Sequence, residues 1–119
     1  MNLDECYSAL KGNYAEARGR LMNDKLVIRF ILKFLSDPSM EELRAGVAAN
    51  DNELAFRAVH TLKGVAANLA FTELYNDASA LTEQMRSLKN SADPQLLAKL
   101  EETYTNVIDV LKRFEQEQA

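Results

Sequence analysis

Residue types that often build disulfides, metal sites and turns are scarce in this chain. Its 119 residues include one cysteine, one histidine, two prolines and four glycines. Cys6 alone cannot form a disulfide within the chain, and one cysteine and one histidine far apart in sequence lack the ligand spacing of a metal site. We therefore expect no bound metal. Few helix-breaking residues and many strong helix formers favour an all-α fold.

Long hydrophobic runs and targeting signals are also missing. The most apolar stretch, residues 26–35, is interrupted by Arg29 and Lys33 and is too short to cross a bilayer. The N-terminus has no basic region followed by an apolar run, so we expect no signal peptide and a cytoplasmic location. A net charge of −4 argues against nucleic acid or an anionic membrane as the main partner. No ATP-binding motif is present.

The apolar pattern predicts a single helical domain over residues 1–119. A short helix is expected over residues 2–11, whereas residues 12–22 are ambiguous. A shorter connecting helix ends near Asn50. Four longer helices are expected near 23–36, 51–69, 72–89 and 94–115, and in the last three of them apolar residues recur at alternating spacings of three and four. These stripes, joined by short loops, predict an antiparallel four-helix bundle with a core of about 23–115 and one or two additional N-terminal or connecting helices.

Particular residues mark the expected helix boundaries. Asp37 before Pro38, and Asp93 before Pro94, each combine an N-capping side chain with a proline suited to the first helical turn. Thr72 is expected to cap the third long helix.

Two segments bear on the surface of this bundle. The helix near 23–36 is apolar over more than half of its circumference, so we expect Phe30 and Phe34 to point inward and another flank to remain available to a partner. Residues 115–119 at the C-terminus are expected to fray.

The second long helix carries the only histidine of the chain. Its apolar stripe recurs at alternating spacings of four and three and consists of Ala55, Val59, Leu62, Ala66 and Leu69. His60 lies off this stripe, and Lys63 and Gly64 follow it by three and four residues, so the three share one helix face. Glycine within a helix costs about 1 kcal/mol relative to alanine. A glycine beside the histidine therefore indicates that something approaches this backbone closely.

The sequence His-Thr-Leu-Lys-Gly at 60–64, followed by Ala-Asn-Leu at 67–69, resembles the signature of histidine-containing phosphotransfer (HPt) domains. This resemblance implies a phosphorelay intermediate of two-component signalling, which is a phosphocarrier rather than an enzyme. It implies that the partner is a receiver domain of a response regulator or a hybrid histidine kinase. That receiver would supply both Mg²⁺ and the phosphoaspartate, and we expect this chain to act as a monomer.

The resemblance assigns a role to each residue of the motif. His60 would be the phosphoacceptor, since a neutral imidazole nitrogen is a competent nucleophile near pH 7. Lys63 would stabilise charge on the phosphoryl oxygens, and Gly64 would leave room for the partner. Many HPt domains orient the imidazole with Gln or Glu on the following helix, and Thr82 stands at that position here. A second departure is Ala70, where the family often has glycine at the corner.

The predicted docking surface surrounds His60. It comprises Phe56, Arg57, Ala67 and Asn68, together with exposed flanks of the helix near 23–36. Phe56 lies off the apolar stripe, four residues before His60, which favours a partner contact over a core position.

Three alternatives remain open at this point. The first is the phosphoacceptor helix of a histidine kinase. Such helices usually have an acidic residue directly after the histidine and a proline soon after it. Here Thr61 and Leu62 follow His60 and the next proline is Pro94, which argues against this alternative. The phosphoacceptor domain of a chemotaxis or hybrid kinase shares the HPt motif. A helical docking module without chemistry would leave His60 incidental, and its partner binding would survive replacement of that residue.

Overall fold

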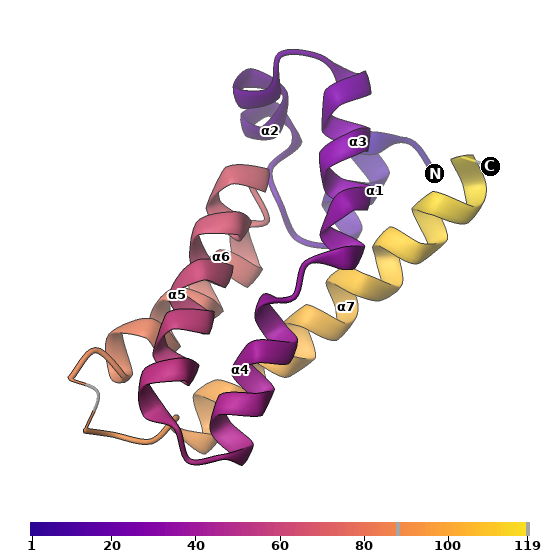
Figure 1. Cartoon of the computed structure of the whole chain (residues 1–119). Helices are drawn as coiled ribbons and strands as arrows, with labels where there is room; N and C mark the ends of the chain where they lie inside the picture. Colours follow the sequence, from indigo (N-terminus) through magenta and orange to yellow (C-terminus); the bar gives the residue numbers. More distant parts are fainter. Residues whose placement is uncertain (88, 119) are drawn as a thin grey trace.

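The computed structural model describes residues 1–87 and 89–118, and within these residues every regular element is a helix. Figure 1 shows their arrangement. The elements in chain order are α1 (Leu3–Ala9), α2 (Tyr14–Leu21), α3 (Asp24–Lys33), the 3₁₀ turn η1 (Phe34–Ser36), α4 (Ser39–Ala48), α5 (Asn52–Leu69), α6 (Thr72–Gln84) and α7 (Pro94–Gln118). The predicted all-α class is confirmed, and the ambiguous segment 12–22 contains a helix.

Helix α5 is at the centre of the bundle. It packs against α4 on one side and α6 on the other, and α6 in turn packs against α7 (Figure 1). The fourth side of the bundle is formed by three elements, because α3, η1 and α4 follow one another along the length of the molecule. The four predicted core helices did not include residues 39–48. This prediction was wrong, because these residues form α4, which packs directly against α5. Gly46 allows a close approach there, since a Cβ atom on it would lie 2.7 Å from the amide nitrogen of Ala55.

One face of α3 is buried and the other is exposed. Val27, Ile31 and Phe34 recur at spacings of four and three, and all three are buried in the core. Phe30 is 36% exposed, so its predicted inward position was wrong. The reason is angular, because Phe30 lies one residue, about 100°, away from Ile31 around the helix axis.

Side chains cap most of the helix starts. Asn2, Asn13, Asn23 and Asp51 each accept a hydrogen bond from the backbone amide three residues later. The predicted cap at Asp93 forms, since its carboxylate accepts from the amides of Gln95 and Leu96. The predicted start at Asp37 was wrong by one residue: α4 begins at Ser39 with Pro38 at the N-cap position, and Asp37, just outside the helix, accepts from the amide of Ser39. These caps satisfy backbone donors that have no partner inside the helix.

Three further predicted boundaries were wrong. Thr72 is the first residue of α6 and makes no capping hydrogen bond, and the amide of Glu73 donates instead to the carbonyl of Lys11, 3.2 Å away. A segment distant in sequence therefore does the capping. Helix α6 ends at Gln84, short of the predicted end at residue 89, and Leu88 lies outside the described residues. Residues 115–118 continue α7 rather than fray, and the N-terminal amino group pairs with the Glu117 carboxylate. Ala119, the last residue of that prediction, lies outside the described residues.

The N-terminal segment holds the corner between α5 and α6. Ala70 adopts the left-handed conformation that ends α5, with φ of 58°. The amide of Asn13 donates to the carbonyl of Ala70 over 2.9 Å, and the buried hydroxyl of Tyr7 donates to the carbonyl of Leu69 over 2.8 Å. A Cβ atom on Gly12 would lie 2.6 Å from the Ala70 carbonyl oxygen, so this approach requires glycine.

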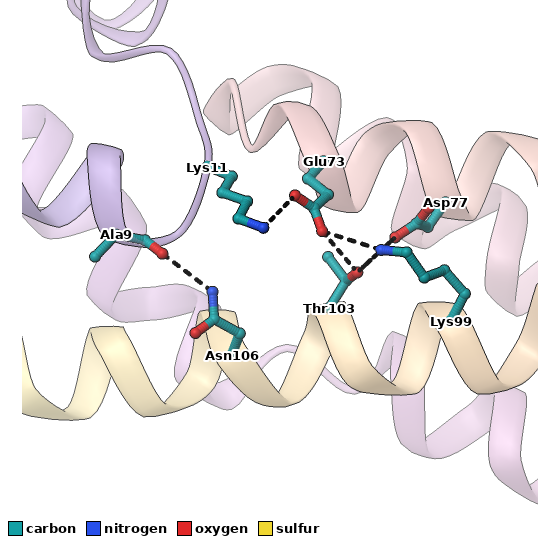
Figure 2. Close-up of polar contacts among 7 residues, drawn as sticks. All are labelled: Ala9, Lys11, Glu73, Asp77, Lys99, Thr103 and Asn106. Atoms are coloured by element: carbon teal, nitrogen blue, oxygen red, sulfur yellow. Dashed lines mark hydrogen bonds and ion pairs between the residues drawn. The ribbon is translucent and has the colours of Figure 1, made fainter.

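A polar cluster joins α6 to α7 and to the turn after α1 (Figure 2). Lys99 on α7 donates to Glu73 and Asp77 on α6, over 3.0 and 3.2 Å. The hydroxyl of Thr103 donates to Asp77 over 2.5 Å, and Lys11 forms an ion pair with Glu73 at 3.5 Å. Lys99 lowers the pKa of Glu73, mainly by donating a hydrogen bond to its carboxylate. No described helix is both long and apolar enough to cross a membrane.

Candidate phosphoacceptor site

Helix α5 fixes the direction in which His60 points. All five residues of the predicted apolar stripe are buried against the neighbouring helices, and this burial turns the opposite face of α5 to solvent. His60 is exposed on that face. Its ring lies 6.0 Å from the ring of Phe56, with an angle of 32° between the two planes. Among the described residues, no hydrogen-bond partner holds either imidazole nitrogen, so both remain open to a reacting group.

Gly64 leaves a bare stretch of backbone one turn beyond His60. It is exposed, and a Cβ atom placed on it would meet nothing within 4 Å. Packing inside the chain therefore does not explain this glycine, in contrast to Gly46.

Lys63 is half-buried on the same face as His60, and it forms no ion pair within the part of the chain that the structure describes. Its charge acts on Glu83 of α6. The pKa of the Glu83 carboxyl is lowered first by hydrogen bonds from Arg86 and then also by the charges of Arg86 and Lys63. Two cations and one carboxylate thus lie close to the α5 face that carries His60.

Arg86 is a site residue that the sequence reasoning missed. It follows the end of α6, yet its side chain lines a hollow of about 230 Å³ together with Phe56, Arg57, His60 and Thr61. Its guanidinium carbon lies 5.8 Å from the centroid of the Phe56 ring, within the range of a cation–π contact. Helical spacing cannot relate it to His60, because a corner and a second helix separate them. No signal in the sequence marks this proximity.

Thr82 is fully buried, and its hydroxyl donates to the carbonyl of Ala78 in its own helix over 2.7 Å. No hydrogen bond connects Thr82 to His60 among residues 1–87 and 89–118, so its expected role in orienting the imidazole stays a prediction. Gln84, a glutamine two residues further along α6, makes its hydrogen bonds to the loop that follows this helix. Its amide group donates to the carbonyl of Ser91 and accepts from the amide of Asp93.

The other predicted contact residues occupy three places on this side of the molecule. Arg57 is exposed, lines the His60 hollow and forms an ion pair with Glu53 at 3.6 Å. Asn68 is exposed and lines a separate hollow of about 270 Å³ that also includes Phe30 of α3. Ala67 is half-buried, and its carbonyl accepts a hydrogen bond from the guanidinium of Arg20 on α2. Only Phe56 and Arg57 of the four therefore share the hollow of His60.

The residues needed for a metal centre are not gathered in the described part of the chain, where no group of three or more His, Cys, Asp or Glu side chains could hold an ion. The arrangement instead presents one imidazole to solvent beside three cations, Arg57, Lys63 and Arg86, and the exposed backbone of Gly64. Such a site suits capture and release of a group brought by a partner.

Comparison with known proteins identifies the family. No curated protein and no solved structure matches the chain at a significant level. The family model described as Hpt domain matches residues 33–110, a segment that contains η1, α4, α5, α6 and most of α7. His60, Lys63 and Gly64 all lie inside this segment. The chain therefore belongs to the Hpt domain family, whose members carry phosphoryl groups on histidine in phosphorelays.

Proposed function

We propose that His60 accepts a phosphoryl group from the phosphoaspartate of one receiver domain and passes it to the aspartate of another. One observation carries this proposal: the only histidine of the chain lies exposed on α5, within the segment that matches the family. A relay through phosphohistidine has no other residue in this chain to use.

The transfer step needs little from this protein beyond position and charge. The outward ring nitrogen of His60 attacks phosphorus, a P–N bond forms, and the P–O bond to the receiver aspartate breaks so that its carboxylate leaves. Phosphoryl transfer depends on alignment and on stabilising charge at the phosphoryl oxygens. Lys63 supplies positive charge one helical turn away, and Mg²⁺ belongs to the receiver. The chain acts as a phosphocarrier, and the reverse step returns it unchanged.

The receiver docks on the α5 face around the imidazole. The bare backbone at Gly64 allows the receiver's active site to close on His60, and Phe56 and Arg57 border the same hollow. Phe30 and Asn68 extend the contact toward α3. A response regulator or a hybrid kinase would provide this receiver, and the chain meets it as a monomer.

The test is phosphoryl transfer from a receiver that carries labelled phosphoaspartate and Mg²⁺. We expect acid-labile, base-stable label on the wild-type chain and none on His60→Gln. Lys63→Gln should slow the transfer by at least about tenfold. Its matched control is Lys112→Gln on α7, which removes the same charge from an exposed residue that does not line the His60 hollow. That control should transfer at the wild-type rate.

A second outcome would favour the docking module without chemistry. If no receiver labels the chain while an established HPt domain is labelled in parallel, the phosphorelay assignment fails. Retained binding of a receiver by His60→Gln, with no transfer by the wild type, would then identify a docking protein.

A further inference from the structure

A charged pair stands at the edge of the His60 hollow. The Arg86 guanidinium donates two hydrogen bonds to the Glu83 carboxylate, from Nε over 3.1 Å and from Nη2 over 2.6 Å. The same guanidinium lies over the Phe56 ring, which itself neighbours the imidazole. Glu83, Arg86 and Phe56 therefore form a connected set that ends at the phosphoacceptor.

Stability does not account for this pair. Both side chains are more than half exposed, and exposed ion pairs contribute little to the free energy of folding. What the pair does fix is the position of one cation. Without Glu83, a long arginine side chain after the end of α6 would sample many rotamers, whereas here its guanidinium is held at the hollow.

We propose that Glu83 is a placeholder for the phosphoryl group: it holds Arg86 beside unloaded His60 and releases it to the phosphoryl oxygens when His60 is loaded. The inference rests on the proposed function, because it requires a phosphoryl group on His60. A guanidinium fork binds a carboxylate and a phosphoryl group with the same bidentate geometry. A phosphoryl dianion carries more charge than a carboxylate, so it competes successfully for the same arginine.

Two neighbouring contacts support the exchange. The Phe56 ring keeps the guanidinium within the hollow, so the move from Glu83 toward His60 is short. Hydrogen bonds from Arg86, with a smaller contribution from the charge of Lys63, lower the pKa of Glu83 and keep its carboxylate ionised. Arg86 is then a phosphoryl-binding residue of the loaded state, and Glu83 is a positioning residue that acts through it.

The experiment loads His60 without any partner. Potassium phosphoramidate phosphorylates exposed histidines directly: the imidazole nitrogen bonds to phosphorus, the P–N bond of the reagent breaks, and ammonia leaves with the proton. Phosphorus NMR then follows the pH at which the phosphohistidine loses its second phosphoryl proton. The variants are Arg86→Gln, Arg86→Lys, Glu83→Gln and the double variant. Arg113→Gln and Glu102→Gln on α7 are the charge-matched controls, since α7 contributes nothing to the His60 hollow.

Arg86→Gln should raise this phosphoryl pKa by about 0.5 unit, roughly a threefold change in proton affinity, because a cation that favours the dianion is lost. Glu83→Gln should lower it by a similar amount, since a competing anion is lost. The change in phosphoryl pKa caused by Glu83→Gln should be smaller in the Arg86→Gln background than in the wild type. Arg86→Lys keeps a positive charge, so its phosphoryl pKa should lie between those of the wild type and Arg86→Gln.

Three results would overturn the proposal. The first is a shift in Arg86→Gln no larger than that in Arg113→Gln. The second is an effect of Glu83→Gln that is equal in both backgrounds, because Glu83 would then act independently of Arg86. The third is a wild-type chain that cannot be loaded on His60 at all. Loading by phosphoramidate without transfer from any receiver would instead refute the relay and leave the placeholder test intact.

Discussion

Replacing Gly64 with alanine should make the chain more stable and a poorer phosphocarrier. Gly64 lies in the interior of α5, is exposed, and has an ordinary helical backbone, since no glycine in the described part of the chain has a positive φ. A methyl group at this position would meet nothing within 4 Å. Packing within the described part of the chain therefore gives no reason for the glycine, and the proposed approach of a partner supplies one.

The expected gain in stability follows from helix propensity. Alanine is favoured over glycine in a helix interior by about 1 kcal/mol, and no clash or lost contact opposes this gain at Gly64. For a domain of this size, such a change raises the melting temperature by roughly 3–6 °C. The same methyl group would keep a receiver from closing on His60, and a displacement of about 1 Å at a reacting centre can cost about 100-fold in rate.

The assay pairs thermal or urea unfolding with the rate of phosphoryl transfer from a labelled receiver. Gly19→Ala is the matched control. Gly19 is also an exposed helical glycine, and a Cβ atom placed on it would likewise meet nothing within 4 Å, but it lies on α2, away from the phosphoacceptor. This control should gain a similar amount of stability and transfer at the wild-type rate.

Two results would refute the reasoning. A loss of stability in Gly64→Ala would mean that the open space beside α5 is not open in solution. A wild-type transfer rate in Gly64→Ala, and also in the larger Gly64→Leu, would mean that the partner does not approach this backbone.

Three other predictions concern the bundle. Gly46→Ala should lower the free energy of unfolding by about 1–3 kcal/mol, measured by urea denaturation, because the new Cβ would press on the Ala55 backbone. Burial raises the pKa of the Cys6 thiol to about 11, so a thiol reagent should leave the folded chain unmodified at pH 8 and label it once urea unfolds it. Lys99 holds the pKa of Glu73 below its ordinary 4.5, so the stability from this pair is present above pH 4.5 and is lost as the pH falls through the lowered value. In urea denaturation at a series of pH values, the free energy of unfolding of Glu73→Gln should fall less at acid pH than that of the wild type.

Features carried by contiguous residues could be predicted from the sequence. The start of α5 at Asp51, its buried stripe and the common face of His60, Lys63 and Gly64 all follow from helical periodicity and capping chemistry within one segment. The start of α7 follows in the same way from an aspartate before a proline, and the same pattern locates the start of α4 to within one residue. Local rules suffice because the atoms that satisfy them lie within one or two turns.

Features that depend on contacts between distant segments could not be predicted. Thr72 does not cap α6, because the carbonyl of Lys11 takes that role from the other end of the chain. Phe30 and Phe34 are the same residue type in one apolar segment. Only the way this segment packs against the bundle decides that Phe34 is buried and Phe30 is exposed.

The sequence by itself determined the helical class, the candidate phosphoacceptor and the two motif residues beside it, because their spacing is fixed by one helix. Only the tertiary structure decided what surrounds the imidazole. The corner after α5 and the antiparallel return of α6 bring Arg86 and Glu83 to the rim of the His60 hollow. The register between two packed helices is set by the fit of many side chains at once, and no single stretch of sequence contains it.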